Sequence, residues 1–311
     1  MVQRSRVTVT WDGVAGAAPL EVAYLEDGPA GGPLALCLHG FPDHAPTWTA
    51  LLGDLAAAGF HAVAPWLRGY APTAVPADGL YQTGALALDA LALADALGRG
   101  PQNGGDARPP VLIGHDWGAI AAYAAVALRP ERFGRLVVMS VPHRAALGAR
   151  LFTSPTQLKR SWYMFFFQLP MAATAVSFND FAFIDTLWAD WSPGFEAPPE
   201  HRRGVKETLA SPGSLDAAIG YYRHLWNPAA HDPRLAEAER AAGGPVPVPS
   251  LYLHGADDGC IGAELVNPDE MKALFPAGVE VDVLDGVGHF LHLEDPARVN
   301  ARIVAFVTGG R

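Results

Sequence analysis

The chain has 311 residues, of which half are hydrophobic and only 17% are charged, so it can bury a full core and is not a disordered protein. Lys and Arg number 22 against 32 Asp and Glu, which gives a formal net charge of −10 and excludes the basic face that nucleic acid or an anionic membrane requires. Cys37 and Cys260 are far apart in apolar surroundings, which predicts neither a disulfide framework nor a zinc site and fits a reducing compartment.

The first ten residues alternate apolar and polar side chains and lack the unbroken apolar run of a signal peptide. The longest strongly apolar stretch, 119–128, is about half the roughly 20 residues that a membrane span needs. We therefore expect a cytoplasmic protein with no membrane span and no nucleic-acid partner. The sequence carries no signal for an oligomeric state.

Two kinds of strand pattern follow one another along the chain. Segments 6–11 and 20–26 alternate with period two and predict an opening antiparallel pair. Later apolar runs lack alternation, which is typical of parallel strands buried on both faces. These runs are 34–38, 61–64, 110–113, 135–140, 248–253 and 279–284. Helices are expected at 46–58, 81–97, 119–128 and 297–307.

The stretch from Pro142 to Asn227 interrupts this alternation of strands and helices. It holds half of the tryptophans, has no buried-strand pattern and consists of helical pieces bounded by prolines. We interpret it as a helical cap, 142–228, inserted into an α/β core formed by 1–141 and 229–311. The fold expected is a mostly parallel eight-stranded sheet, and such an insertion would cover the carboxyl ends of the strands, where these sheets bind ligands.

A Gly-His-Asp-Trp-Gly motif at 114–118 joins the strand 110–113 to a helix. This is the small-x-nucleophile-x-small spacing of a nucleophile elbow, in which only small residues fit beside the central one. Asp116 would lie at the positive end of the helix. An Asp that merely caps the helix is the alternative for the motif taken alone.

The rest of the chain supplies the partners that a nucleophile elbow requires, in the order nucleophile, acid, base. Asp258 follows the strand 248–253, with Asp257 as the alternative acid, and His289 follows the strand 279–284 in a glycine turn. The His-Gly-Phe-Pro run at 39–42 has the position that supplies an oxyanion N–H, so Phe41 and Trp117 are the expected donors.

These pieces, together with Arg68-Gly69-Tyr70 and two cap segments, resemble the epoxide hydrolases of the α/β-hydrolase fold over nearly the whole chain. The resemblance implies two cap tyrosines that hold the epoxide oxygen. Tyr163 has the place of the first and Tyr222 that of the second, with Tyr221 as the alternative.

The resemblance also implies the chemistry. A lipophilic epoxide would alkylate Asp116, and water activated by His289 and Asp258 would hydrolyse the resulting ester to a vicinal diol, without a cofactor or metal. The family usually has an Asp directly before Arg-Gly-Tyr-Gly, whereas here Trp66 and Leu67 precede this motif and Ala71 ends it. This departure leaves the shape of the substrate pocket open.

Four other functions compete. Haloalkane dehalogenases share an Asp nucleophile followed by Trp, but they need a second halide donor, which the Phe41 side chain cannot provide. Haloacid dehalogenases would have Arg at Trp117, to grip a carboxylate. A non-catalytic binder on the same fold is also compatible. A metallohydrolase would use His39, His44, His115 and Asp116, which show no recognised ligand spacing.

Overall fold

The computed structural model describes residues 1–98, 108–148 and 150–310 and contains one sheet with the order β1-β2-β4-β3-β5-β6-β7-β8. β1 pairs antiparallel with β2, and β2 pairs antiparallel with β4, whereas all the other pairs are parallel. This confirms the mostly parallel eight-stranded fold. The strands are β1 (Gln3–Val9), β2 (Leu20–Asp27), β3 (Leu34–Leu38), β4 (His61–Pro65), β5 (Val111–His115), β6 (Arg135–Met139), β7 (Ser250–Gly255) and β8 (Val279–Leu284).

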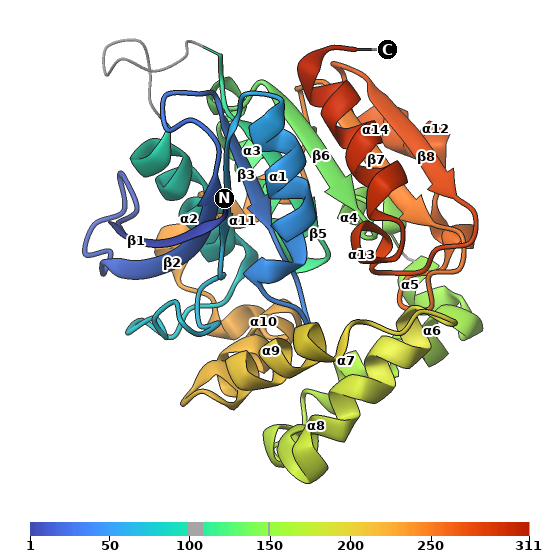
Figure 1. Cartoon of the computed structure of the whole chain (residues 1–311). Coiled ribbons are helices and arrows are strands. Elements are labelled where there is room, and N and C mark those ends of the chain that lie inside the picture. The colour runs from blue at the N-terminus through green and yellow to red at the C-terminus, as the bar shows by residue number, and fades with distance from the viewer. Residues whose placement is uncertain (99–107, 149, 311) are drawn as a thin grey trace.

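Helices cover both faces of the sheet (Figure 1). On one face α1 (Thr49–Ala57) packs against α14 (Pro296–Thr308). On the other, α2 (Thr83–Leu97), α3 (Trp117–Leu128) and α11 (Ala236–Ala241) pack together. Because both faces are covered, every residue of β3, β4, β5 and β7 is buried, which explains why these strands read as apolar runs.

β8 differs from the expectation that it would be buried on both faces. It is an edge strand in which only Leu284 is buried. The exposed Glu280 and the partly buried Asp282 form ion pairs with Arg302 on α14. A strand with one neighbour leaves part of its surface to solvent, and charged side chains there protect the edge from further pairing.

Several element ends differ from the sequence-based expectation by a few residues. β1 ends at Val9 rather than at 11, and Trp11 instead donates its indole N–H to Asp89 on α2, at 2.7 Å. The helix expected at 46–58 begins with a separate turn, Ala45–Trp48, before α1. α3 begins two residues early, directly after Asp116.

The described chain between β6 and β7 contains helices and no strand. In Figure 1 most of these helices, α6 to α10, gather beyond one end of the sheet. The α-helices described between β6 and β7 begin with α4 (Arg144–Leu147), α5 (Arg150–Thr153), α6 (Pro155–Arg160), α7 (Trp162–Phe166), α8 (Ala172–Trp191), α9 (Pro199–Ala210) and α10 (Ser214–Trp226). The next one, α11, packs back onto α2 and α3. Two further helices, α12 (Pro268–Leu274) and α13 (Leu291–Glu294), flank β8 in sequence. None of the described helices combines the length and the apolarity that crossing a membrane would demand.

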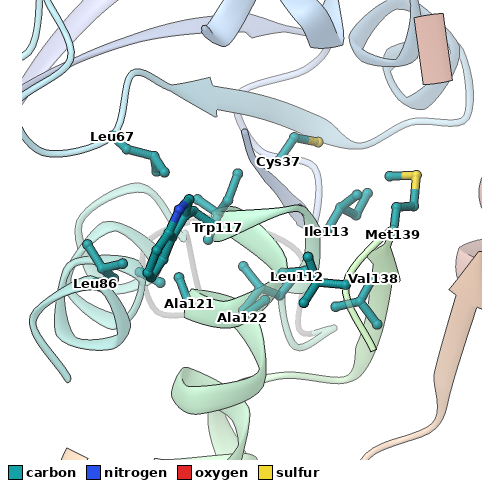
Figure 2. Close-up of a cluster of buried hydrophobic side chains, with 14 of the residues drawn as sticks. Cys37, Leu67, Leu86, Leu112, Ile113, Trp117, Ala121, Ala122, Val138 and Met139 are labelled. Atoms are coloured by element: carbon teal, nitrogen blue, oxygen red, sulfur yellow. The ribbon is translucent and has the colours of Figure 1, made fainter. Parts of the chain in front are cut away.

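The core beside β5 holds α3 close to the sheet. Figure 2 shows the buried cluster, in which Leu112 and Ile113 of β5 lie near Ala121 and Ala122 of α3, and the Trp117 ring lies beside Leu86. Small alanines on the inner face of α3 let the helix approach the strand closely. The turn between β5 and α3 is therefore fixed on both sides by packed core.

Candidate active site

The turn that carries Asp116 has a backbone that only this local sequence permits. Asp116 has φ 51° and ψ −119°, a sparsely populated region for a residue other than glycine. A Cβ on Gly114 would lie 2.4 Å from the Gly118 carbonyl oxygen, and one on Gly118 would lie 2.1 Å from the Leu38 carbonyl oxygen. Glycine at both positions therefore lets β3, β5 and α3 meet around the turn.

Two backbone N–H groups face the Asp116 carboxylate. The Phe41 N–H donates to Oδ1 at 2.7 Å, and the Trp117 N–H is the second donor. The carboxylate does not cap α3 through its side chain, so the helix-cap alternative does not describe it. A side chain at Gly40 would clash with it, since a Cβ there would lie 2.2 Å from Oδ1.

Burial raises the pKa of Asp116 to about 7, even though the Phe41 and Trp117 N–H groups lower it. The charges of Asp258 and Asp43 raise it further. Because a buried carboxylate has few water molecules to stabilise its charge, the ionised form is reactive as a nucleophile once it is present.

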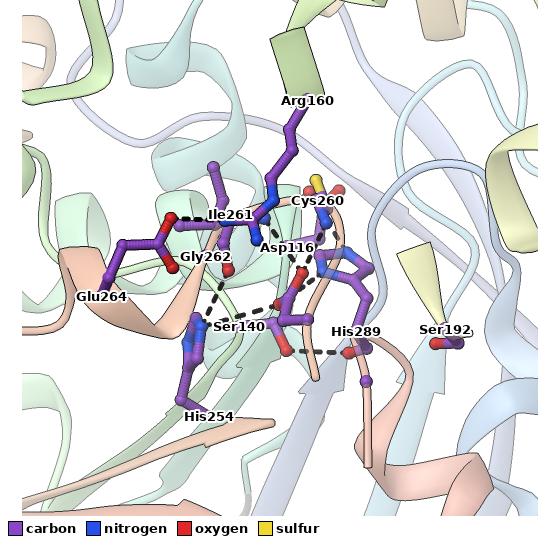
Figure 3. A network of polar contacts seen from close by, with 12 residues as sticks. Asp116, Ser140, Arg160, Ser192, His254, Cys260, Ile261, Gly262, Glu264 and His289 are labelled. Carbon is purple, nitrogen blue, oxygen red and sulfur yellow. Dashed lines mark hydrogen bonds and ion pairs between the residues drawn. The ribbon is translucent and has the colours of Figure 1, made fainter. Parts of the chain in front are cut away.

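His289, which Figure 3 shows next to Asp116, pairs with Asp258. His289 Nδ1 lies 3.0 Å from Asp258 Oδ2, and the Cys260 and Ile261 N–H groups donate to Asp258 Oδ1 at 2.7 and 2.9 Å. His289 Nε2 is buried, has no hydrogen-bond partner among the described residues and lies 4.0 Å from Asp116 Oδ2. A gap of this length between polar atoms can hold one bridging water.

Burial sets the protonation states of this pair. It lowers the pKa of His289 to about 3, so the imidazole is neutral at pH 7 and Nε2 can accept a proton. It raises the pKa of Asp258, against the opposing effect of His254 and of the Ile261 and Cys260 N–H groups. Because the Asp258 carboxylate accepts a hydrogen bond from His289 Nδ1–H, the ring proton stays on Nδ1 and the lone pair is on Nε2.

Asp257, the alternative acid, lies elsewhere. Its side chain is exposed, and its backbone N–H donates to the Val287 carbonyl at 3.0 Å. The structure thus brings Asp258, rather than Asp257, to His289.

Tyr163 on α7 and Tyr222 on α10 line a cavity of about 350 Å³ together with Asp116. The two rings are 5.6 Å apart. The Tyr163 hydroxyl lies 3.4 Å from Cys260 Sγ, and the Tyr222 hydroxyl has no hydrogen-bond partner among the described residues. Burial raises the pKa of both phenols, and the Asp116 charge raises both further, so they remain protonated donors at neutral pH.

Tyr221 points away from this cavity. Its hydroxyl donates to the Arg68 carbonyl oxygen at 2.9 Å, and its ring stacks on Tyr81 at 5.7 Å. Consecutive residues of a helix face different directions, so α10 can present only one of its two neighbouring tyrosines to Asp116.

The remaining cavity wall is mostly apolar. Its apolar side chains come from α3 and from the helices between β6 and β7: Ile120, Leu147, Leu151, Phe152, Met164, Leu225 and Trp226, with Ile261 from the loop after β7. Such a wall favours a lipophilic ligand whose reactive atoms meet the few polar groups.

The loop that carries His289 depends on residues that sequence reasoning missed. The Ser140 hydroxyl and the His115 ring N–H both donate to the His289 carbonyl oxygen, at 2.8 and 2.9 Å. The Ser192 hydroxyl donates to Glu294 at 2.6 Å and accepts from the Phe290 N–H at 3.1 Å. Single serines have no spacing signal, so only the fold reveals that they converge on this loop.

Two residues that differ from the pattern of the family that the sequence resembles lie outside the cavity. Neither Trp66 nor Ala71 lines it, and both instead line a separate groove beside α9. Arg68 is buried and pairs with Asp89 through contacts of 2.6 and 3.1 Å. The Arg-Gly-Tyr segment therefore supports the wall of the site indirectly, through the Tyr221 contact with the Arg68 carbonyl.

The four residues considered for a metallohydrolase do not form a ligand set. His39 Nδ1 bonds the Gly40 carbonyl at 2.9 Å, and its Nε2 accepts from the Leu67 N–H at 3.1 Å. His115 Nε2 bonds a carbonyl, as described above. Of His39, His44 and His115, only His44 belongs to a group of residues whose potential metal-ligand atoms lie close together.

Comparisons with known proteins agree with this geometry. Residues 35–302 match the model of the alpha/beta hydrolase family. An epoxide hydrolase of Caballeronia sordidicola is 29% identical over 320 residues, with 89% of this chain and 88% of that protein covered. The crystal structure of an epoxide hydrolase from Vigna radiata has a TM-score of 0.76 and 26% identity, with 98% of both chains covered. A protein from Klebsiella pneumoniae has a TM-score of 0.83 and 26% identity, with 97% of this chain and 96% of that one covered. The sheet, the turn at Asp116 and these similarities lead to one conclusion: the chain belongs to the alpha/beta hydrolase family.

Proposed function

We propose that the protein is an epoxide hydrolase that converts a lipophilic epoxide into a vicinal diol. The observation that carries this proposal is a carboxylate at the nucleophile turn that shares one mostly apolar cavity with two protonated phenols. The similarity to proteins named epoxide hydrolases, at up to 29% identity over most of the chain, supports it.

In the first step Asp116 Oδ2 attacks an epoxide carbon. Oδ1 is held by the Phe41 N–H, so Oδ2 is the oxygen left for attack. The carbon–oxygen bond of the ring breaks, and its electron pair goes to the epoxide oxygen. Tyr163 and Tyr222 stabilise that oxygen by hydrogen bonding, and one of them supplies a proton. The product is an ester of Asp116 that carries a neighbouring hydroxyl.

In the second step a water between His289 Nε2 and the ester attacks the carboxyl carbon while His289 takes its proton. Charge develops on Oδ1, which the Phe41 N–H already holds, and the Trp117 N–H donates to the same carboxyl group; each such donor is worth roughly 3 kcal/mol. Collapse releases the diol with Oδ2 as one of its oxygens, and the water oxygen stays in Asp116. The attacking water supplies two protons: His289 passes the one it took to the leaving Oδ2, and the new carboxylic acid of Asp116 loses the other, which restores the phenol and returns Asp116 to its ionised form.

The cavity favours an epoxide over a haloalkane. A departing halide needs two N–H donors at the place where the carbon–halogen bond breaks, but among the described cavity residues Trp117 can offer only one indole N–H, the Phe41 side chain offers no donor, and the other donors there are phenol hydroxyls. We infer that residues 142–228 act as a cap that supplies these phenols, and that the enzyme works in the cytoplasm, where its two free buried thiols would stay reduced.

The test is the variant His289→Gln mixed with styrene oxide and followed by intact-protein mass spectrometry. Since the first step does not use His289, the variant should accumulate an adduct of one epoxide mass, located on the peptide that contains Asp116. The double variant with Asp116→Asn is the control and should stay unmodified. An unmodified His289→Gln, together with a wild-type enzyme inert toward an epoxide panel, would favour a non-catalytic binder. Halide release from haloalkanes without any diol would favour a dehalogenase.

A further inference from the structure

A second polar cluster lies where α9 meets the loop after β3, away from the cavity of the proposed reaction. Asp43 and His44 belong to that loop and His201 belongs to α9. Each offers one potential metal-ligand atom, and these atoms all lie within 4.8 Å of one another. His201 Nε2 is 2.9 Å from Asp43 Oδ1.

The cluster is buried and not fully satisfied by hydrogen bonds. The Asp43 side chain is fully buried and that of His201 is 9% exposed. Asp43 Oδ2 and His44 Nε2 are buried without a hydrogen-bond partner among the described residues. Buried polar atoms are nearly always paired, so two unpaired ligand-type atoms in one cluster indicate a missing partner.

The surroundings hold His44 in a ligand-competent form. The Gly204 carbonyl on α9 accepts a hydrogen bond from the His44 ring, an arrangement that fixes the ring and leaves its other nitrogen with a lone pair. A Cβ on Gly204 would lie 2.4 Å from His44 Cε1, so the bare backbone there makes room for the ring.

Other charged and titratable groups around the cluster are compatible with a cation. His292 Nε2 lies 3.9 Å from Asp43 Oδ2 but is engaged with Thr47 at 2.6 Å. A groove of about 640 Å³ opens beside His44 and His201, and Glu200, Glu207 and Arg4 also line it. The groove provides an entry path and room for water as a further ligand.

We propose that Asp43, His44 and His201 bind a divalent transition-metal ion of the Zn²⁺ class. Two imidazoles and one carboxylate, with a fourth position open to water, form a recurring zinc ligand set. Zinc–ligand bonds are roughly 2.0–2.2 Å long, so tetrahedral ligands lie about 3.3 Å apart and the side chains need to shift by only about 1 Å. The ion would clamp α9 to the loop that carries Phe41, two residues before Asp43. This site is independent of the proposed reaction, since no step uses these residues.

The experiment uses the full chain freed of metal with a chelator and titrated with Zn²⁺ by calorimetry, and with Co²⁺ followed by its visible absorption. The wild type should bind one ion and gain thermal stability on binding. His201→Gln and Asp43→Asn should each weaken binding by at least about 100-fold, because each removes a direct ligand.

Two control variants identify the site. His231→Gln removes a partly buried histidine near a carboxylate, Glu239 at 4.0 Å, outside the cluster and should bind like the wild type. Cys260→Ser removes the thiol of a second possible ligand group, Asp258–Cys260–His289, and should leave the stoichiometry unchanged. Equal affinity in the wild type and in both ligand variants would overturn the proposal, as would loss of binding in Cys260→Ser. Circular dichroism of each variant excludes misfolding as the cause of a loss.

Discussion

The sheet and the helices between β6 and β7 contribute different halves of the proposed active site. The sheet contributes the ionisable groups, Asp116, Asp258 and His289, each on a loop directly after a parallel strand. The helices contribute neutral donors, Tyr163 from α7 and Tyr222 from α10. Backbone geometry local to a strand end places the charges, whereas packing between distant helices places the phenols.

This difference predicts that the two halves fail in different ways. Substitution of an ionisable group in the loops after the strands should stop one chemical step almost completely, because no other side chain of the site can take over its role. Changes to the phenols should slow ring opening more moderately, because two donors share one oxygen.

The largest effect is expected for the acid of the sheet. Asp258→Asn should slow hydrolysis of the ester by about 10³-fold or more, because an amide favours the wrong His289 tautomer. Asp257→Asn is the matched neighbour and should stay within twofold, since its side chain is exposed and makes no contact with His289. Single-turnover kinetics on an epoxide measure both. The reverse ranking would assign the acid role to Asp257.

A smaller effect is expected for the helices. Tyr163→Phe and Tyr222→Phe should each slow alkylation of Asp116 by roughly 10²-fold without changing the thermal stability greatly. Tyr221→Phe is the control, because its hydroxyl bonds the Arg68 carbonyl outside the cavity. Stopped-flow measurement of tryptophan fluorescence during alkylation gives the rates. Alkylation at the wild-type rate in both Tyr163→Phe and Tyr222→Phe would show that the phenols take no part in ring opening.

The smallest effect concerns pH. Burial raises the pKa of Asp116 to about 7, so the nucleophile becomes protonated as pH falls through this value, and alkylation should slow about tenfold between pH 8 and pH 6. Burial lowers the pKa of His289 to about 3, so the base itself remains neutral over this range. Burial also raises the pKa of Asp258 to about 7, so hydrolysis of the ester should slow as Asp258 becomes protonated. Quenched-flow mass spectrometry of the ester measures both rates. An alkylation rate that is flat from pH 8 to pH 6 would contradict the raised pKa of Asp116.

Sequence reasoning succeeded where local physics decides the structure. Unbroken apolar runs identified the buried parallel strands, and glycine spacing located the turn at Asp116, because sterics at Gly114 and Gly118 allow little else. It was wrong for β8, whose sequence Val-Glu-Val-Asp-Val-Leu alternates apolar and acidic residues, as a strand that leaves part of its surface to solvent does. The ends of β1 and α1 also differed by a few residues.

The polar network around the site depends on distances that no spacing encodes. Ser140, Ser192 and Glu294 converge on the His289 loop from three separate segments. His201 meets Asp43 across 158 positions of sequence, so the cluster beside α9 had no local signal. The choice between Tyr221 and Tyr222 likewise needed the orientation of α10 against the sheet.

The most direct test of the account follows the oxygen atoms. The enzyme is allowed many turnovers of an epoxide in heavy-oxygen water, and the peptide that contains Asp116 is then weighed. The account predicts heavy oxygen in the Asp116 side chain, and a first-turnover diol whose new oxygen is the unlabelled one from Oδ2. Labelled diol from the first turnover, with an unlabelled Asp116, would show that water attacks the epoxide directly and would contradict the covalent mechanism.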